Sequence, residues 1–153
     1  MDAYRPLDDD ARDLARTLMS QAMAGALGTL RGRVPMVTRV GCVWIRGQGV
    51  VMLISDLSDH ARALAAMPDC SILLGDVVAR GDPLTQPRLT LLGRAEVCDK
   101  AALRDDYLTA RPKARLYFDF TDFRLLRILP SEGLLNGGFG KAYRFSAEEI
   151  AAL

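Results

Sequence analysis

The sequence predicts a mainly β fold of the α+β class: a closed or nearly closed antiparallel barrel with helices at its ends. Six or seven short apolar segments recur along the chain, Gly- and Pro-rich turns join several of them, and three or four helical patterns stand between them. Short turns join antiparallel neighbours, so a doubly wound parallel sheet is not expected. A G-x-G-x-x-G after the first strand, a Walker sequence and a serine nucleophile elbow are all missing from the sequence.

The composition is that of an ordinary globular protein, and one domain is expected over residues 1–153. The formal net charge is +1, and Lys and Arg are spread along the chain. A basic stripe is the usual mark of nucleic-acid binding, so no such partner is expected. No apolar run reaches the ~20 residues that span a bilayer, and the N-terminus is too polar for a secretory signal. A cytoplasmic protein without a membrane partner is therefore expected.

The cysteines are expected to be unpaired and structural. Cys42, Cys70 and Cys98 are an odd number, no C-x-x-C pair occurs, and the chain has one histidine. These counts do not suit a zinc site, so no metal site is predicted. A catalytic pair of Cys42 or Cys70 with His60 stays open as an alternative, although nothing in the sequence supports it.

The first half of the chain predicts one helix followed by three strands. Asp8-Asp9-Asp10 opens an amphipathic helix, because apolar residues recur at helical spacing from Ala11 to Ala22. Strands are expected over residues 25–30, 36–45 and 50–54, with turns at 31–35 and 46–49. Arg39 interrupts the second strand, and Gly41 permits close approach of another backbone or of a flat ligand.

The second half alternates helices with further strands. A helix begins at Ser58 and ends near Pro68, and another runs from about Lys100 until Pro112 breaks or restarts it. Strands are expected over residues 70–75, 88–97 and 125–129, with 132–136 as a further candidate. The glycines of residues 137–141 predict a tight loop, and Ser146-Ala147-Glu148-Glu149 is a capping box for a last short helix.

The stretch from Ser55 to Arg62 is the strongest candidate site in the residues themselves. An apolar strand ends there in Ser-x-x-Ser and continues into a helix, so hydroxyls, free backbone N–H groups and the positive end of a helix come together. These are the parts of an anion or phosphate site, and His60 and Arg62 add donors. The alternative is a plain capped helix with Ser58 as the N-cap, which the local sequence alone favours.

The ordered set of segments resembles the pyridoxamine 5′-phosphate oxidase-like family of FMN-binding split barrels. The likeness runs from about Ala24 to Ala142 and rests on residues 37–40, 53–58, 67–69, 88–96 and 107–112. Within that family, residues 55–64, 81–84, 87–90 and 137–142 look like the haem-utilisation subgroup of haem-degrading oxygenases. The resemblance implies a six-stranded split barrel and a homodimer with the ligand at its interface.

The resemblance further implies an FMN-dependent oxidoreductase that acts on a small molecule of unknown identity. Arg39 and Val40 would lie beside the flavin, and Arg88 would approach from the next strand or from across the interface. The residues expected to bind the cofactor are Arg39, Val40, Ser55, Ser58, His60, Arg62, Arg88 and Lys141. The flavin supplies the redox chemistry in such enzymes, so no side chain is assigned a catalytic role.

Departures from the family pattern leave two alternatives open. His60-Ala61 stands where pyridoxamine-phosphate oxidases have Arg-Lys, Leu89 stands where they have Gln, and their Trp-Arg-Leu-x-Pro signature is missing. Vitamin B6 oxidation is therefore not expected. The additional C-terminal domain of the fuller haem-degrading members is not matched either. The alternatives are a haem-binding module without flavin and a dimeric barrel without a cofactor.

Overall fold

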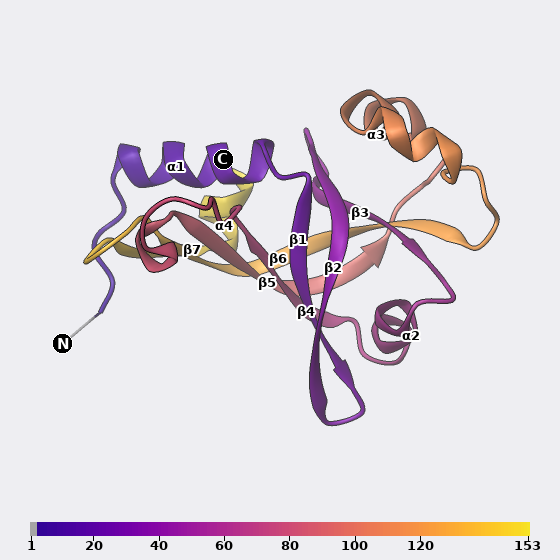
Figure 1. Ribbon diagram of the computed structural model, residues 1–153, viewed down its shortest axis with the longest axis horizontal. Helices are drawn as coiled ribbons and strands as arrows, with labels where there is room; N and C mark the ends of the chain where they lie inside the picture. The colour runs from indigo at the N-terminus through magenta and orange to yellow at the C-terminus, as the bar shows by residue number, and fades with distance from the viewer. Residues whose placement is uncertain (1–2) are drawn as a thin grey trace.

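The structure, a computed structural model, describes residues 3–153 and confirms the predicted split barrel (Figure 1). Its sheet has the strand order β3-β2-β1-β4-β5-β6-β7, and all pairings between neighbouring strands are antiparallel. An additional pairing of β3 with β6 closes the first six strands into a barrel. The strands are β1 (Ala24–Arg31), β2 (Val34–Ile45), β3 (Gly49–Ser55), β4 (Asp69–Leu74), β5 (Arg88–Val97), β6 (Phe123–Asn136) and β7 (Ala142–Ser146).

The helices stand at the ends of the barrel and on one outer face, as expected. They are α1 (Asp9–Ser20), α2 (Asp59–Ala66), α3 (Arg104–Ala110) and α4 (Ala147–Ala151), with 3₁₀ turns η1 (Pro83–Thr85) and η2 (Pro112–Leu116). Figure 1 shows α1 and α4 together at one side and α2 at the other. No helix within residues 3–153 is both long enough and apolar enough to cross a membrane.

The helix caps follow the sequence signals. Asp8 caps α1 by accepting from the Ala11 backbone N–H at 2.7 Å. Ser146 and Glu149 form the reciprocal capping box at the start of α4. The predicted helix from Lys100 begins later, at Arg104, because residues 100–103 form turns in which the Asp99 carboxylate accepts from the Ala102 N–H.

Strand β6 is the main correction to the predicted elements. Residues 125–129 and 132–136 belong to one strand of 14 residues rather than two. The register shifts between Leu92 and Gly93, where Gly93 lies opposite Pro130. A bulge tolerates proline because the missing N–H leaves no ladder bond broken. The strand therefore passes through Pro130 and pairs with β3, β5 and β7 along its length.

Two apolar cores hold the barrel. The larger lies inside it and is covered by α1, with Met19, Cys42, Met52 and Phe145 among its buried members. The smaller lies on the outer side of β2 and β3, where it is covered by α3 and η2. Its buried members are Val43, Ile45, Val51, Leu53, Tyr107, Leu108, Ala114, Phe118 and Leu125. The second half of β2 is thus buried on both faces, whereas its first half is covered on one face at most.

We expect Gly93→Ala to destabilise the protein by about 3 kcal/mol or more, because overpacking of this kind cannot be relieved by a side-chain rotation. A Cβ at this position would lie 2.0 Å from the backbone oxygen of Leu129. Guanidinium denaturation would measure the change. The matched control is Gly32→Ala, where φ is +64° but no atom lies within 4 Å; it should cost about 1 kcal/mol. Equal losses would contradict the steric explanation.

Candidate functional site

The turn between β3 and α2 uses its own hydroxyls. Ser55 Oγ donates to Asp122 Oδ2 at 2.6 Å and accepts from the Leu57 N–H at 3.2 Å. Ser58 Oγ donates to the Ser55 carbonyl at 2.7 Å and accepts from the Ala61 N–H at 3.2 Å. Ser58 is therefore the N-cap of α2, as the capped-helix interpretation predicts. A ligand at this turn would have to compete with these contacts.

His60 is the half-buried residue of the turn. Its Nδ1 lies 3.1 Å from Thr38 Oγ1 on β2, which leaves Nε2 as the ring nitrogen without a hydrogen bond to residues 3–153. Burial lowers the pKa of His60, with the nearby Asp59 carboxylate opposing that shift. The imidazole is therefore held in its neutral form, which is the form that binds metals. Arg62 is exposed and lies 3.7 Å from Asp59, a weak surface ion pair.

A buried hydroxyl on β1 was not predicted from the sequence. Thr29 on β1 is 3% exposed, and its Oγ1 has no hydrogen-bond partner within the described part of the chain. It faces the same side as Leu27, which pairs in register with Thr38. A buried polar group without a partner is costly, so this end of the barrel suits a water or ligand that could satisfy it.

Arg39 and Val40 point to opposite sides of β2, as successive residues of a strand do. Val40 is buried in the core inside the barrel, and so is Ile54. Arg39 is exposed on the outer face and has no hydrogen-bond or ion-pair partner among residues 3–153. Of these side chains, Arg39 is therefore the one open to a ligand on the outer face.

The outer face beside Arg39 carries small side chains. Arg39 lies opposite Ala26 on β1, and Ala26 lies opposite Leu73 on β4. In the neighbouring row Val37 lies opposite Gly28, which lies opposite Ser71. Val37 is 70% exposed and Leu73 is 41% exposed. The result is a flat, largely apolar patch with a cation on its border, which we call the outer patch: Ala26, Gly28, Val37, Arg39, Ser71 and Leu73.

Arg111 borders the outer patch and was not predicted. Its guanidinium lies 3.0 Å from the position that a Cβ of Gly41 would occupy, and Nη1 donates to the Met23 carbonyl. Gly41 faces the same side as Arg39, two residues away. The glycine was expected to permit close approach of a backbone or a flat ligand; in the structure the planar group that approaches is Arg111. The strand glycine was thus the one signal for it.

Arg88 and Lys141 lie together at another end of the molecule. Arg88 Nη1 donates to the carbonyls of Leu84 and Gln86 at 3.0 and 3.1 Å, which fixes the loop around η1. Arg88 pairs in register with Asn136, immediately before the loop that ends in Lys141. Lys141 is exposed and its side chain has no partner in the described residues.

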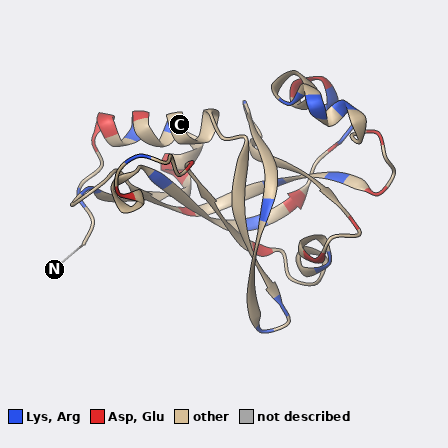
Figure 2. Ribbon diagram, viewed as in Figure 1, with Lys and Arg blue, Asp and Glu red and all other residues tan. Residues whose placement is uncertain are grey.

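The predicted site residues therefore form two groups in one chain. Ser55 pairs with Phe123 and Arg88 pairs with Asn136, at opposite ends of β6. Thirteen residues separate these partners (136 − 123), and a strand rises about 3.3 Å per residue, so the path along β6 is roughly 40 Å. Figure 1 shows α2 and β7 far apart, and Figure 2 shows Lys and Arg spread over both ends. One small ligand cannot touch both groups within one chain.

The cysteines offer no nucleophile at neutral pH. Burial raises the pKa of the Cys42 and Cys70 thiols to about 11, and a neutral thiol is a poor nucleophile. All three cysteines are free, and His60 contacts Thr38 instead. The part of the chain that the structure describes holds no cluster of three His, Cys, Asp or Glu side chains arranged for a metal ion.

Comparisons with known proteins show which family and which relatives the chain is similar to. Residues 11–136 match the family model described as pyridoxamine 5′-phosphate oxidase. The chain is 33% identical over 149 residues to the chloroplastic haem oxygenase HOZ of Arabidopsis thaliana, covering 90% of this chain and 44% of that protein. It is 30% identical over 114 residues to the haem oxygenase HutZ of Vibrio cholerae, covering 67% of this chain and 62% of HutZ.

A solved structure of a haem-binding protein is also similar to this chain. A haem-binding protein from Mycobacterium smegmatis superposes with a TM-score of 0.85 at 32% identity, over 97% of this chain and 61% of that chain. This chain therefore spans about half to three fifths of the length of the proteins named here.

These relatives correct the expected activity. They are named for haem and not for a flavin. The prediction of an FMN-dependent oxidoreductase is wrong, and the haem alternative is the one that the relatives favour. A physical reason accompanies the correction: both serine hydroxyls expected to bind the flavin phosphate already have partners in the turn, and His60-Ala61 stands where stronger phosphate binders carry two cations.

His60 should make the stability of the protein depend on pH just below neutrality. Its lowered pKa means that the unfolded chain takes up a proton before the folded one does as the pH falls through its ordinary value of 6.5. Stability is therefore full above pH 6.5 and falls as the pH is lowered toward the folded-state pKa. Urea denaturation between about pH 7.5 and pH 5.5 would measure this change.

The control for this prediction is His60→Gln, which removes the only histidine of the chain. Its stability should be flat over the same interval, because Asp and Glu ordinarily titrate at lower pH. An unchanged slope in the variant would show that another group causes the pH dependence.

Proposed function

Because the chain belongs to the pyridoxamine 5′-phosphate oxidase family and resembles its haem proteins, we propose that it is a haem-binding protein of haem utilisation. The observation that carries the proposal is the outer patch beside Arg39. A flat, largely apolar surface suits the face of a porphyrin, and a cation on its border suits a propionate.

The donor set of the chain fits haem. Arg39 has no partner among residues 3–153, and Arg111 lies beside it. His60, the only histidine of the chain, contacts Thr38, which points to the face of β2 opposite Arg39, so its imidazole is not placed at the outer patch. Arg39, Val37 and Leu73 would hold the haem. Bound haem would supply the chemistry of its iron with oxygen, and these residues would bind it, orient it and exclude water.

We propose that the protein forms a homodimer with haem at the interface between the two chains. The support is the separation of the two groups of site residues along β6: a ligand that meets Arg39 in one chain can meet Arg88 or Lys141 only from a second chain. Apolar side chains near Arg88 are also exposed, namely Val77, Val78, Leu84 and Phe139. Such exposed side chains are typical of surfaces that another protein covers.

Haem binding would test the proposal directly. The purified protein, titrated with haemin, should develop a Soret band that saturates at one haem per chain. Arg39→Ala should raise the Kd about tenfold, because a charge-assisted contact is worth at least 1.4 kcal/mol. The matched control is Arg46→Ala, an exposed arginine in the β2–β3 turn, which should change the Kd by less than about twofold. The absence of a saturable Soret band would contradict the proposal.

A complementation experiment would test the shared site. Arg39→Ala and Arg88→Ala chains should each bind haem weakly. When the two variants are mixed in equal amounts and their subunits exchange, half of the dimers are heterodimers. Each heterodimer has one site with both arginines. About a quarter of all sites should then regain high affinity, as two-fold symmetry requires.

Failure of the mixture to regain affinity, with exchange verified by mass, would show that the two arginines do not act on one haem. A protein that remains monomeric at micromolar concentration in sedimentation velocity would exclude the shared site altogether.

A further inference from the structure

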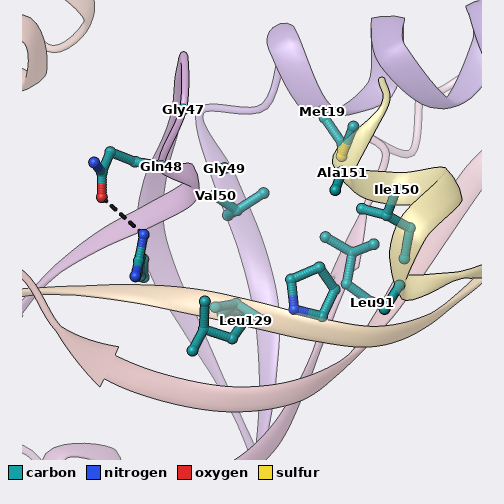
Figure 3. A pocket seen from close by; sticks show the side chains of 13 residues that line it. Met19, Gly47, Gln48, Gly49, Val50, Leu91, Leu129, Ile150 and Ala151 are labelled. Atoms are coloured by element: carbon teal, nitrogen blue, oxygen red, sulfur yellow. Dashed lines mark hydrogen bonds between the residues drawn. The ribbon is translucent and has the colours of Figure 1, made fainter.

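A cavity of about 320 Å³ opens at the end of the barrel between α1, α4 and the β2–β3 turn. Figure 3 shows Val50, Leu91 and Ile150 around the same space, with Gln48 at one side. Met19, Val50, Leu91 and Ile128 line it and belong to the core inside the barrel. The cavity therefore lies on the opposite side of the sheet from the outward-pointing Arg39.

The cavity is larger than a packing defect. Protein interiors rarely leave voids larger than a water molecule, and an apolar cavity of 150 Å³ is already large enough to bind benzene. The space here is about twice that size. Ligand sites also occur preferentially at the mouths of β-barrels.

Helix caps and a turn hydrogen bond hold the elements that form the walls of the cavity. The capping box of Ser146 and Glu149 holds the start of α4, and Asp8 holds the start of α1. In the β2–β3 turn, the Gln48 N–H donates to the Ile45 carbonyl at 2.9 Å. A site built on capped helices and a closed turn requires little ordering when it binds.

Gln48 lies at one side of the cavity, with its amide directed away from the apolar side chains (Figure 3). Gln48 Oε1 accepts from Arg127 Nη1 at 3.2 Å, whereas Gln48 Nε2 has no hydrogen bond to any residue within 3–153. Arg127 is the only charged residue in the lining, and its charge is balanced by Glu96 at 2.5 Å. An ionic ligand would therefore be buried without a counter-charge, which is costly.

We propose that this cavity binds a small uncharged ligand with a two-ring aromatic body, held by the apolar side chains of its lining. The proposal is independent of haem binding at the outer patch.

The probe for the test is prodan, an uncharged naphthalene ketone whose emission moves to shorter wavelength in apolar surroundings. Titrated into the protein without haem, it should show a saturable blue shift. Ala151→Leu, which narrows the cavity, should raise the Kd about tenfold, whereas Ala152→Leu should change it by less than about twofold. Ala152 is the adjacent exposed alanine outside the lining.

Haem titration of Ala151→Leu completes the test, with an unchanged Kd expected. A haem Kd that rises together with the prodan Kd would show that the cavity is part of the haem site. That result would overturn the proposal of a separate small-ligand site. Prodan emission that stays as in water, or equal losses in the Ala151 and Ala152 variants, would overturn the proposal as well. Melting curves that match the unchanged protein would show that the variants are folded.

Discussion

The pairing of β6 with three other strands is the constraint on which the rest of the structure depends. Its first residues pair with β3 and close the barrel, its middle pairs with β5, and its last residues pair with β7. The bulge opposite Pro130 lets one strand run through the whole length. The residues before Pro130 pair with both β3 and β5 and close the barrel, whereas those after it pair with β5 and β7. The same length also separates Ser55 from Arg88, so barrel closure itself divides the predicted site.

The alternation of side chains along β2 decides which part of the barrel can meet a ligand. From Cys42 onward the strand is buried by the inner core on one face and by α3 on the other. Before that point the outer face has no helix over it, and small residues of β1 lie beside Arg39. Val40, one residue later, points into the core. A large flat ligand on this side of the sheet can therefore lie only on the first half of β2 and its neighbours.

Local signals in the sequence predicted what local physics controls. Ser58 and Ser146 were recognised as caps because the cap contact spans only three residues. The strands β1 to β5 were found within two residues at each end, from apolar runs between turns. Pro130 misled the prediction, because a bulge is set by the partner strand. The contact of Arg111 with Gly41 joins residues 70 positions apart, 111 − 41, and only the glycine hinted at it.

The electrostatics of the candidate site also explain why haem suits it better than a flavin phosphate. A phosphate dianion needs several donors converging on one point. At the start of α2 the hydroxyls hold the turn, Arg62 pairs with Asp59, and the imidazole of His60 is kept neutral by burial. What remains available at the outer patch, within residues 3–153, is the unpartnered Arg39 and apolar surface between small residues. These features suit a ligand that is broad, mostly apolar and anionic only at its edge.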